Sequence, residues 1–305
     1  MRTVDLFCGV GGLSLGLSRA GFDIVAGVDF WRPALEVYAY NNPEHDAHHV
    51  DISDTDSVLT VVSHYRPYCI VGGPPCQDFS TAGNKKEGDR ADLTIAFAKI
   101  ICKTRLRPQY FIMENVARAA NSDAVKTATE LFKETGYGLS THILDASLCG
   151  VPQKRKRMFI VGAMNTPDNF LTPFVDAKLA KKPMTVRDYF GDNCNFDNYY
   201  RHPRNYNRRS VFSADEPSPT IRGVNRPVPK GHKKHTGDTT DASKVSALTT
   251  AQRAMIQTFP ADYKWHGSRT AQEQMIGNAV PVNLGQFIGQ AVMDYMHARY
   301  IECAA

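Results

Sequence analysis

The sequence has no regular cysteine pattern. Its seven cysteines are an odd number, form no Cys-x-x-Cys pair, and lie scattered at positions 8, 69, 76, 102, 149, 194 and 303. Disulfide frameworks and structural zinc sites both need cysteines in pairs or groups at set spacings. The pattern therefore argues against both kinds of site, predicts no metal ion, and favours a reducing compartment.

Long apolar runs and a large charge excess are also missing. No apolar stretch approaches the roughly 20 residues that cross a bilayer. The sequence opens Met1-Arg2-Thr3 and enters a predicted strand at Val4, which leaves no room for a signal peptide. We therefore expect a cytoplasmic protein with no membrane partner. The net charge of +5 is too small to establish a nucleic-acid partner, so the location of the basic residues matters more than their number.

What the sequence does have is a regular alternation of strand and helix patterns over its first 165 residues. With 305 residues, 42% of them hydrophobic, the chain can form one large domain and a smaller one. Strands are predicted at 4–7, 22–28, 48–52, 69–71, 110–113, 138–144 and 158–162, and helices at 13–20, 95–102 and 124–132. This alternation predicts an α/β fold with a doubly wound, mostly parallel sheet and helices on both faces.

The pattern changes after residue 165. Eight of the 17 prolines lie between 167 and 229, which favours irregular backbone. Nine arginines and lysines lie between 196 and 235 against three acidic residues, interleaved with aromatic side chains. This mixture suits phosphate contacts and base stacking, and it also suits an ordinary solvated surface. We predict domains at 1–165 and 166–245, then a return segment at 246–305 whose last helix packs on the first domain.

A glycine-rich turn, Cys8-Gly9-Val10-Gly11-Gly12, follows the first predicted strand. Glycine has no side chain to clash, so such a turn allows a ligand to approach the backbone closely. A dinucleotide-binding fingerprint would need a further glycine where this sequence has Ser14. Asp29 ends the second strand, the position from which a carboxylate bonds ribose hydroxyls, and Phe30 could lie against adenine. These features favour an adenosine ligand other than a dinucleotide, and S-adenosylmethionine fits.

A second turn places a cysteine directly after the predicted strand at 69–71. The residues Gly72-Gly73-Pro74-Pro75-Cys76 form a rigid exit from the sheet, because each proline fixes its own backbone and extends the residue before it. The Cys76 thiol would then lie at the carboxyl end of a strand, where open α/β sheets place their active sites. A small buried cysteine beside a tight turn is the alternative interpretation of these residues alone.

Together these segments resemble the cytosine-5 DNA methyltransferase family, of the bacterial or phage restriction-modification type. Five sequence blocks appear in the family's order and span nearly the whole chain. They lie at 5–12, 73–80, 114–116, 153–157 and 274–281. The region 166–245 lacks a family pattern beyond Pro-Ser-Pro-Thr at 217–220. The resemblance implies that 1–165 is the catalytic and cofactor-binding domain and that 166–245 is the target-recognition domain.

The resemblance also implies the ligands and the residues that hold them. The cofactor S-adenosylmethionine, and its product S-adenosylhomocysteine, would lie against Phe7, Gly9, Gly11, Asp29, Phe30, Asp51, Ile52, Pro74, Leu93, Asn278 and Val280. Double-stranded DNA would contact Gln77, Ser80, Arg209, Arg222 and Arg226. We expect a monomer in the cytoplasm of a prokaryotic cell or a phage-infected host. The recognised DNA sequence, and whether a restriction endonuclease acts at the same site, stay open.

The chemistry of carbon-5 methylation explains the need for these residue types. Carbon 5 of cytosine is a poor nucleophile, and addition of a thiolate to carbon 6 makes the ring enamine-like. The resemblance makes Cys76 that nucleophile and Glu114 the acid at ring nitrogen 3, while Arg155 and Arg157 hold the base and brace the active-site loop. The target base must leave the duplex stack, so 166–245 would contact base edges in the major groove.

Three alternatives remain at this point. A tRNA cytosine-5 methyltransferase shares these blocks, but that branch carries a Cys-Phe-Thr signature that this sequence lacks. A catalytically silent DNA-binding relative is disfavoured because Cys76, Glu114, Arg155 and Arg157 are all present. A nicotinamide oxidoreductase, from another class, is disfavoured by Ser14 and by the Pro-Pro-Cys turn.

Overall fold

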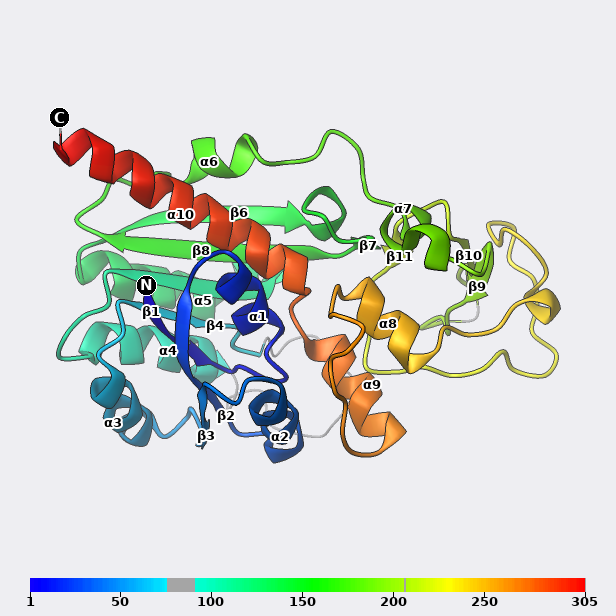
Figure 1. Ribbon diagram of the computed structural model, residues 1–305, viewed down its shortest axis with the longest axis horizontal. Coiled ribbons are helices and arrows are strands. Elements are labelled where there is room, and N and C mark those ends of the chain that lie inside the picture. The colour runs from blue at the N-terminus through cyan, green and yellow to red at the C-terminus, as the bar shows by residue number, and fades with distance from the viewer. Residues whose placement is uncertain (76–90, 206, 305) are drawn as a thin grey trace.

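The computed structural model describes residues 1–75, 91–205 and 207–304, so Cys76, Gln77 and Ser80 lie outside the described residues. The chain forms a larger body around a central sheet and a smaller body beside it (Figure 1). The strands of the central sheet are β1 (Arg2–Leu6), β2 (Asp23–Asp29), β3 (Asp46–His49), β4 (Cys69–Gly72), β5 (Tyr110–Val116), β6 (Tyr137–Asp145) and β8 (Lys156–Met164). The helices of the larger body are α1 (Gly12–Arg19), α2 (Arg32–Asn41), α3 (Thr55–Tyr65), α4 (Ala91–Lys103), α5 (Asp123–Glu134), α6 (Thr172–Asp176) and α10 (Val282–Ala304).

The central sheet has the order β3-β2-β1-β4-β5-β8-β6. Neighbouring strands are parallel except at β8, which runs antiparallel to β5 and β6. The prediction of a doubly wound, mostly parallel sheet is therefore confirmed. The strand order reverses between β1 and β4, and open sheets of this kind bind ligands beyond the carboxyl ends of the strands at such a point. The turns that follow Leu6 of β1 and Gly72 of β4 lie at this point.

Two of the predicted elements differ from the observed ones. The third strand was expected at 48–52 but spans Asp46–His49, so Ile52 lies in the turn before α3. The basic segment 153–157, which lies between the strands predicted at 138–144 and 158–162, is not a loop throughout. Gln153–Lys154 form β7, which pairs in parallel with β11 (Ser218–Pro219). The partner strand lies far along the chain, so no local pattern could indicate the pairing.

The two faces of the sheet are covered by different helices. In β4, Cys69 and Val71 pack in the cluster that contains α1 and α10, whereas Ile70 packs in the cluster that contains α3, α4 and α5. Successive side chains of a strand point to opposite faces, and both faces here are buried. This explains why the central strands are continuous apolar runs rather than alternating ones.

The helix α10 crosses the sheet beside α1, as Figure 1 shows. Its residues Leu284, Ile288, Ala291 and Val292 are fully buried, in the same cluster as Leu13 of α1. Pro281 directly precedes the first helical residue, where its fixed backbone suits a helix start. The chain therefore returns to its first helix after building the smaller body. Among the described residues, no helix is long and apolar enough to cross a membrane.

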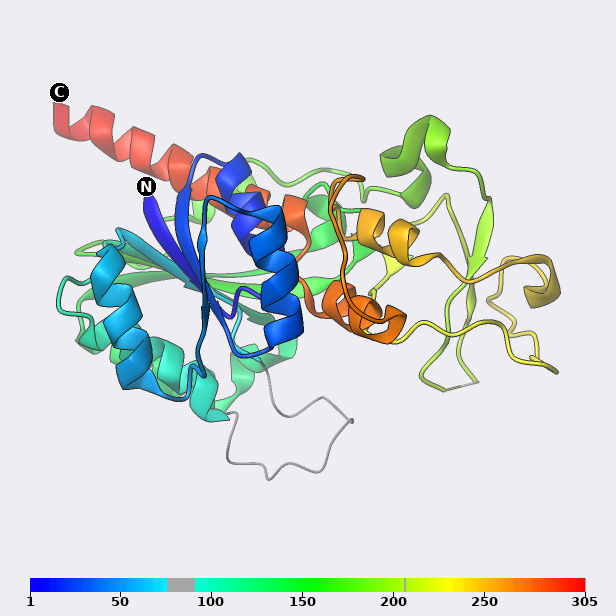
Figure 2. The ribbon, with the colours of Figure 1, turned by 60° about the horizontal axis from the view of Figure 1, so that its bottom comes forward.

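The smaller body contains short elements joined by irregular chain (Figures 1 and 2). Its elements are α7 (Val186–Phe190), β9 (Asn198–Tyr200), β10 (Val211–Ser213), β11, α8 (Thr250–Ile256) and α9 (Arg269–Asn278). Single 3₁₀ turns occur in the two bodies at Ala117–Asn121, Ala146–Leu148, Gly191–Asn193 and Ala242–Lys244. Phe170, Leu171 and Val175 follow residue 165 in the sequence, but their side chains pack in the core of the central sheet. The helices α8 and α9 contribute side chains to the core of the smaller body.

Candidate active site

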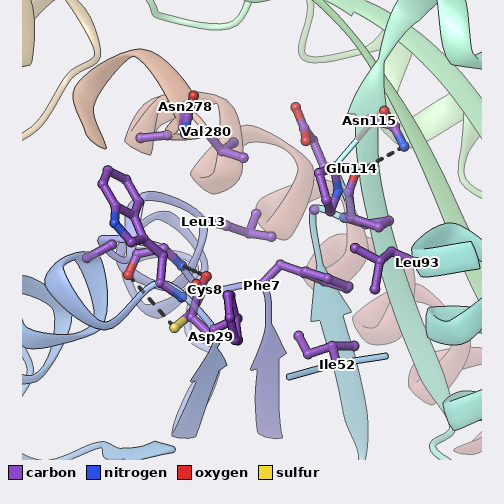
Figure 3. A pocket seen from close by; sticks show the side chains of 18 of the residues that line it. Phe7, Cys8, Leu13, Asp29, Ile52, Leu93, Glu114, Asn115, Asn278 and Val280 are labelled. Carbon is purple, nitrogen blue, oxygen red and sulfur yellow. Dashed lines mark hydrogen bonds between the residues drawn. The ribbon is translucent and has the colours of Figure 1, made fainter. Parts of the chain in front are cut away.

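A cavity of about 1380 Å³ lies at the carboxyl ends of β1 and β4 (Figure 3). A drug-sized ligand needs a pocket of roughly 300–1,000 Å³, so this one has room for two ligands side by side. It is lined by thirteen of the residues expected from the sequence, namely Phe7, Gly9, Asp29, Phe30, Asp51, Ile52, Pro74, Leu93, Glu114, Arg155, Arg157, Asn278 and Val280. Gly11 does not line it and lies instead against Tyr38 and Tyr263.

Asp29 holds the glycine-rich turn in place. Its Oδ2 accepts the Gly9 N–H at 2.8 Å, and its Oδ1 accepts the Trp31 N–H at 2.7 Å. Burial raises the pKa of this carboxyl, and the two N–H donors act against that rise. Each carboxylate oxygen has a further lone pair, so the side chain can still accept hydrogen bonds from a ligand in the cavity.

Asp5 lies beneath the same turn and is completely buried. The Ser14 hydroxyl donates to its Oδ2 at 2.5 Å, and its Oδ1 has no hydrogen-bond partner among the described residues. Burial raises the pKa of Asp5 to about 7, with Ser14 opposing the rise. The serine that distinguishes this turn from a dinucleotide fingerprint therefore serves as the partner of a buried carboxyl.

The far end of the chain forms the opposite wall of the cavity. A side chain at Gly12 would collide with the Val280 carbonyl, so the two backbones are in direct contact. The Tyr263 hydroxyl donates to the Val10 carbonyl and adds a second link. Asn278 and Val280 face the cavity across from Phe7 (Figure 3). The cavity is therefore closed by segments from both ends of the described chain.

Glu114 and Arg157 form an ion pair inside the cavity. Arg157 Nε lies 2.8 Å from Glu114 Oε1, with the side chains 13% and 10% exposed. The strand register pairs Glu114 with Phe159 and Val116 with Arg157, so the two charged side chains are diagonal neighbours on one face of the sheet. A Cβ added at Gly73 would lie 3.1 Å from Glu114 Oε2. The carboxyl therefore sits beside the turn that leads to Pro74 and Pro75.

Asn115 fixes that turn from the other side. Its Nδ2 donates to the Pro74 carbonyl at 3.2 Å, and the residue is 3% exposed. Glu114 thus lines the cavity, while its neighbour Asn115 bonds the turn. Cys76 lies outside the described residues, and the described chain before it ends at Pro75, in the cavity wall.

Arg155 is buried and bonds the backbone of two other stretches of chain. Its guanidinium donates to the carbonyls of Ile221 at 3.1 Å, Gly277 at 3.3 Å and Ala279 at 3.0 Å. Burial lowers the pKa of Arg155, the nearby Arg157 adds to the effect, and Glu114 opposes it. The side chain therefore links the wall of the cavity to the smaller body.

The arginines expected to contact DNA have different surroundings. Arg209 pairs with Glu216 through both carboxylate oxygens and lies over the Phe212 ring at 4.4 Å. Arg222 donates to the His202 carbonyl at 2.5 Å and has no acidic partner among the described residues. Burial lowers the pKa of Arg222, with Arg204 contributing. Arg226 is exposed.

Sequence reasoning missed several residues that line the cavity. Trp31 follows Asp29 and Phe30 directly, so its aromatic side chain after a strand end was the available signal. Lys99 and Lys103 lie one helical turn apart on α4, and Arg204 reaches the cavity from the smaller body. Arg204 had no signal in the sequence because its approach depends on how the two bodies pack, and the approach of Lys99 and Lys103 depends on how α4 packs on the sheet.

Solved structures of similar fold are methyltransferases. A protein described as a DNA modification methyltransferase encoded within an E. coli prophage superposes with a TM-score of 0.73 at 19% identity, covering 97% of this chain and 99% of its own. The S. pombe Dnmt2 methyltransferase superposes with a TM-score of 0.70 at 18% identity, covering 98% and 99%. The fold is therefore that of the Rossmann-like methyltransferases.

Sequence relatives define the family. Type II methyltransferase M.HindV of Haemophilus influenzae is 50% identical over 298 residues, covering 97% of each chain. Type II methyltransferase M.HgiDI of Herpetosiphon aurantiacus is 49% identical over 298 residues, covering 97% of this chain and 96% of its own. The model of the C-5 cytosine-specific DNA methylases matches residues 1–294, and the chain belongs to that family. It is an enzyme of DNA cytosine-5 methylation, and the nicotinamide oxidoreductase alternative is wrong.

Proposed function

We propose that this enzyme transfers a methyl group from S-adenosylmethionine to carbon 5 of a cytosine rotated out of a specific double-stranded DNA sequence. The observation that carries the proposal is that two chemically different sets of residues line one cavity. One wall has the glycine turn, Asp29 and Phe30, and the other has the Glu114–Arg157 pair beside the turn that precedes Cys76. Methyltransferases of this family generally use S-adenosylmethionine.

The first wall suits an adenosine ligand. Asp29 keeps lone pairs for ribose hydroxyls while its bonds to Gly9 and Trp31 fix its orientation. Phe30 is 64% exposed and lines the cavity, and its ring stacks on His49 at 6.0 Å, which leaves the other face of the ring available to adenine. When bound, S-adenosylmethionine supplies a methyl group on a sulfonium centre, which is open to attack by an electron-rich carbon.

The second wall suits a cytosine ring. The Cys76 thiolate adds to carbon 6, and Glu114 shares a proton with ring nitrogen 3, which stabilises the adduct. Arg157 keeps the Glu114 carboxyl in place through their 2.8 Å contact. After carbon 5 gains the methyl group, a base removes the carbon-5 proton and the electrons of that bond expel the Cys76 thiolate. The product is 5-methylcytosine.

The smaller body supplies the DNA surface. Its basic residues contact phosphates, and a few arginines, with Arg209, Arg222 and Arg226 as candidates, contact base edges in the major groove. Gln77 and Ser80 would contact DNA beside Cys76. The names of the relatives as Type II methyltransferases support a role in restriction-modification, with a cognate endonuclease acting on the same sequence. We place the enzyme, as a monomer, in the cytoplasm of a prokaryotic cell or a phage-infected host.

A trapping experiment tests this function. A duplex with 5-fluorocytosine at the target should form a stable covalent complex with the enzyme and S-adenosylmethionine, because fluorine cannot leave as a proton does. Cys76→Ser should abolish both the complex and methylation while retaining cofactor binding. Cys194→Ser, in the smaller body, is the matched control and should form the complex normally. An equally stable complex with Cys76→Ser would remove Cys76 from the mechanism.

A further inference from the structure

Two fully buried amide side chains lie behind the cavity wall. Gln153 Oε1 accepts the Ile221 N–H at 2.9 Å, and Gln153 Nε2 donates to Gln257 Oε1 at 2.7 Å. Gln257 Nε2 in turn donates to the Ala279 carbonyl at 3.0 Å and to the Ile276 carbonyl at 2.5 Å. The two amides thus form a bridge of hydrogen bonds from Ile221 to Ala279.

Arg155 forms a second bridge between the same two residues. Its Nη1 donates to the Ile221 carbonyl at 3.1 Å and its Nη2 to the Ala279 carbonyl at 3.0 Å. The two bridges close a ring of hydrogen bonds through Ile221, Gln153, Gln257, Ala279 and Arg155. A buried polar group that loses its hydrogen-bond partner destabilises the structure. If Ile221 and Ala279 moved apart, several of these buried groups would lose their hydrogen bonds at once.

The ring joins two functional stretches of backbone. Ala279 lies between Asn278 and Val280, which line the cavity, and Ile221 directly precedes Arg222. The backbones also touch, because a Cβ added at Gly277 would collide with the backbone of Arg222–Gly223. Because the two backbones are in direct contact, neither stretch can move toward the other.

We propose that Gln257 is a positioning residue that holds the cofactor wall (residues 278–280) and the target segment (residues 221–223) in one geometry, so that occupancy of either site strengthens binding at the other. The inference rests on the proposed function for the identity of both ligands. Gln257 lies at the carboxyl end of α8 and does not line the cavity. It acts through the backbone carbonyls of Ile276 and Ala279. Coupling of this kind is reciprocal between the two ligands.

The test measures the gain in affinity for S-adenosylhomocysteine caused by DNA. Calorimetric titration gives its dissociation constant for the enzyme alone and with a duplex carrying the sequence found methylated in an expressing host. A scrambled duplex is the blank. We expect a gain of about 5- to 150-fold for the unmodified enzyme, the usual range of coupling between sites. In Gln257→Met, of similar volume, the gain should fall toward one while affinity for S-adenosylhomocysteine alone changes little.

Two further variants separate coupling from stability. Gln153→Met opens the ring from the other side and should also lose the gain. Gln272→Met, in α9, removes an amide that donates to the Gly267 carbonyl in an exposed hydrogen bond outside the ring, and it should retain the gain. A purely structural role for Gln257 would lower the melting temperature and leave the gain intact. An unmodified enzyme without any gain, or a Gln257→Met variant with the full gain, would overturn the proposal.

Hydrogen exchange of the unmodified enzyme gives an answer even if both ring variants fail to fold. S-Adenosylhomocysteine alone should slow exchange of the Ile221 amide, whose bond to Gln153 belongs to the ring. Unchanged exchange there would also overturn the proposal. Failure of the proposed function is recognised separately, because it appears as loss of the Cys76-dependent covalent complex.

Discussion

The two bodies of this protein bury charge for different purposes. In the larger body, the interior of the sheet is apolar, with side chains such as Ile70 of β4 and Phe111 of β5 in one cluster. Of its buried ionisable groups, Glu114 and Arg155 line the cavity, and Asp5 lies beneath the glycine-rich turn beside it. In the smaller body, buried charged groups join segments to one another: Asp238 accepts backbone N–H groups of irregular chain, and Glu273 of α9 accepts side-chain donors from α8 and from Asn225. Buried charges therefore lie at or beneath the cavity in the larger body and connect neighbouring segments in the smaller one.

Asp238 and Glu273 show the second use. Burial alone would raise the pKa of Asp238, but N–H donors from Ser210, Val211 and His235 outweigh it and lower the pKa. Glu273 accepts hydrogen bonds from Arg253, Asn225 at 3.0 Å and Thr250 at 2.9 Å. Such carboxylates are stable when buried because their oxygens are supplied with donors. They connect segments of the smaller body, whose strands are short and form few backbone hydrogen bonds with one another.

Glu114→Gln sharpens this distinction most, since it keeps the shape of the side chain and removes its proton. Loss of a general acid costs about a hundred- to ten-thousand-fold in rate, so turnover should fall by that order with DNA affinity little changed. Single-turnover methyl transfer measures the effect. The matched variant Glu273→Gln should destabilise the fold, because breaking a buried pair costs about 3–5 kcal/mol, and leave turnover per folded molecule unchanged. Normal turnover in Glu114→Gln would exclude Glu114 from the chemistry.

Asp5→Asn should remove a pH dependence of stability. The folded-state pKa of Asp5 is about 7 against 3.8 when exposed, so its contribution is full below about pH 4 and is lost as the pH rises to about 7. The difference between these two pKa values corresponds to about 4 kcal/mol. Relative to Asp5→Asn, the free energy of unfolding of the unmodified enzyme should therefore fall by up to that amount between about pH 4.5 and pH 8. Urea denaturation at both values measures it, and parallel behaviour of the two proteins would contradict the assignment.

Arg222 and Arg209 test whether the smaller body's own charges are structural or available to DNA. Arg222 has no acidic partner among the described residues, so Arg222→Ala should cost about 1–3 kcal/mol of binding and relax preference at one position of the target. Arg209 pairs with Glu216 and must leave it to contact a base. If it stays paired, Arg209→Ala lowers stability and leaves the methylated sequence unchanged. Sequencing the methylated sites of each variant distinguishes these outcomes, and an unchanged preference in both would place base recognition elsewhere.

The smallest effect is expected from the exposed lysines of the smaller body. Lys230, Lys233 and Lys234 are exposed. Replacing all three with alanine should weaken binding to every duplex alike and reduce the slope of affinity against salt by about 0.9 for each phosphate that is no longer neutralised. The methylated sequence should stay the same. An unchanged salt slope would show that these lysines do not approach the DNA backbone.

Local patterns predicted the larger body because its elements are long and buried on both faces. The turn residues after β1 and β4 had specific signals, and thirteen of the predicted residues do line one cavity. The pairing of Gln153–Lys154 with Ser218–Pro219 could not be predicted, since a two-residue strand has no periodicity. Gln257 was missed for a related reason, because its partners, the Gln153 amide and the carbonyls of Ile276 and Ala279, come together only in the folded chain. The partner of Arg209 was equally hidden, since Glu216 lies in the irregular region.

The contact between Gly12 and Val280 also sets an order of events during synthesis. A ribosome makes the glycine turn about 270 residues before the segment that closes it, a delay of roughly 15–50 s at 5–20 residues per second. Until then the nascent chain lacks one side of its cavity. A message cut short before residue 277 yields a chain that never gains it. We therefore expect DNA methylation only from chains that have been translated past Val280.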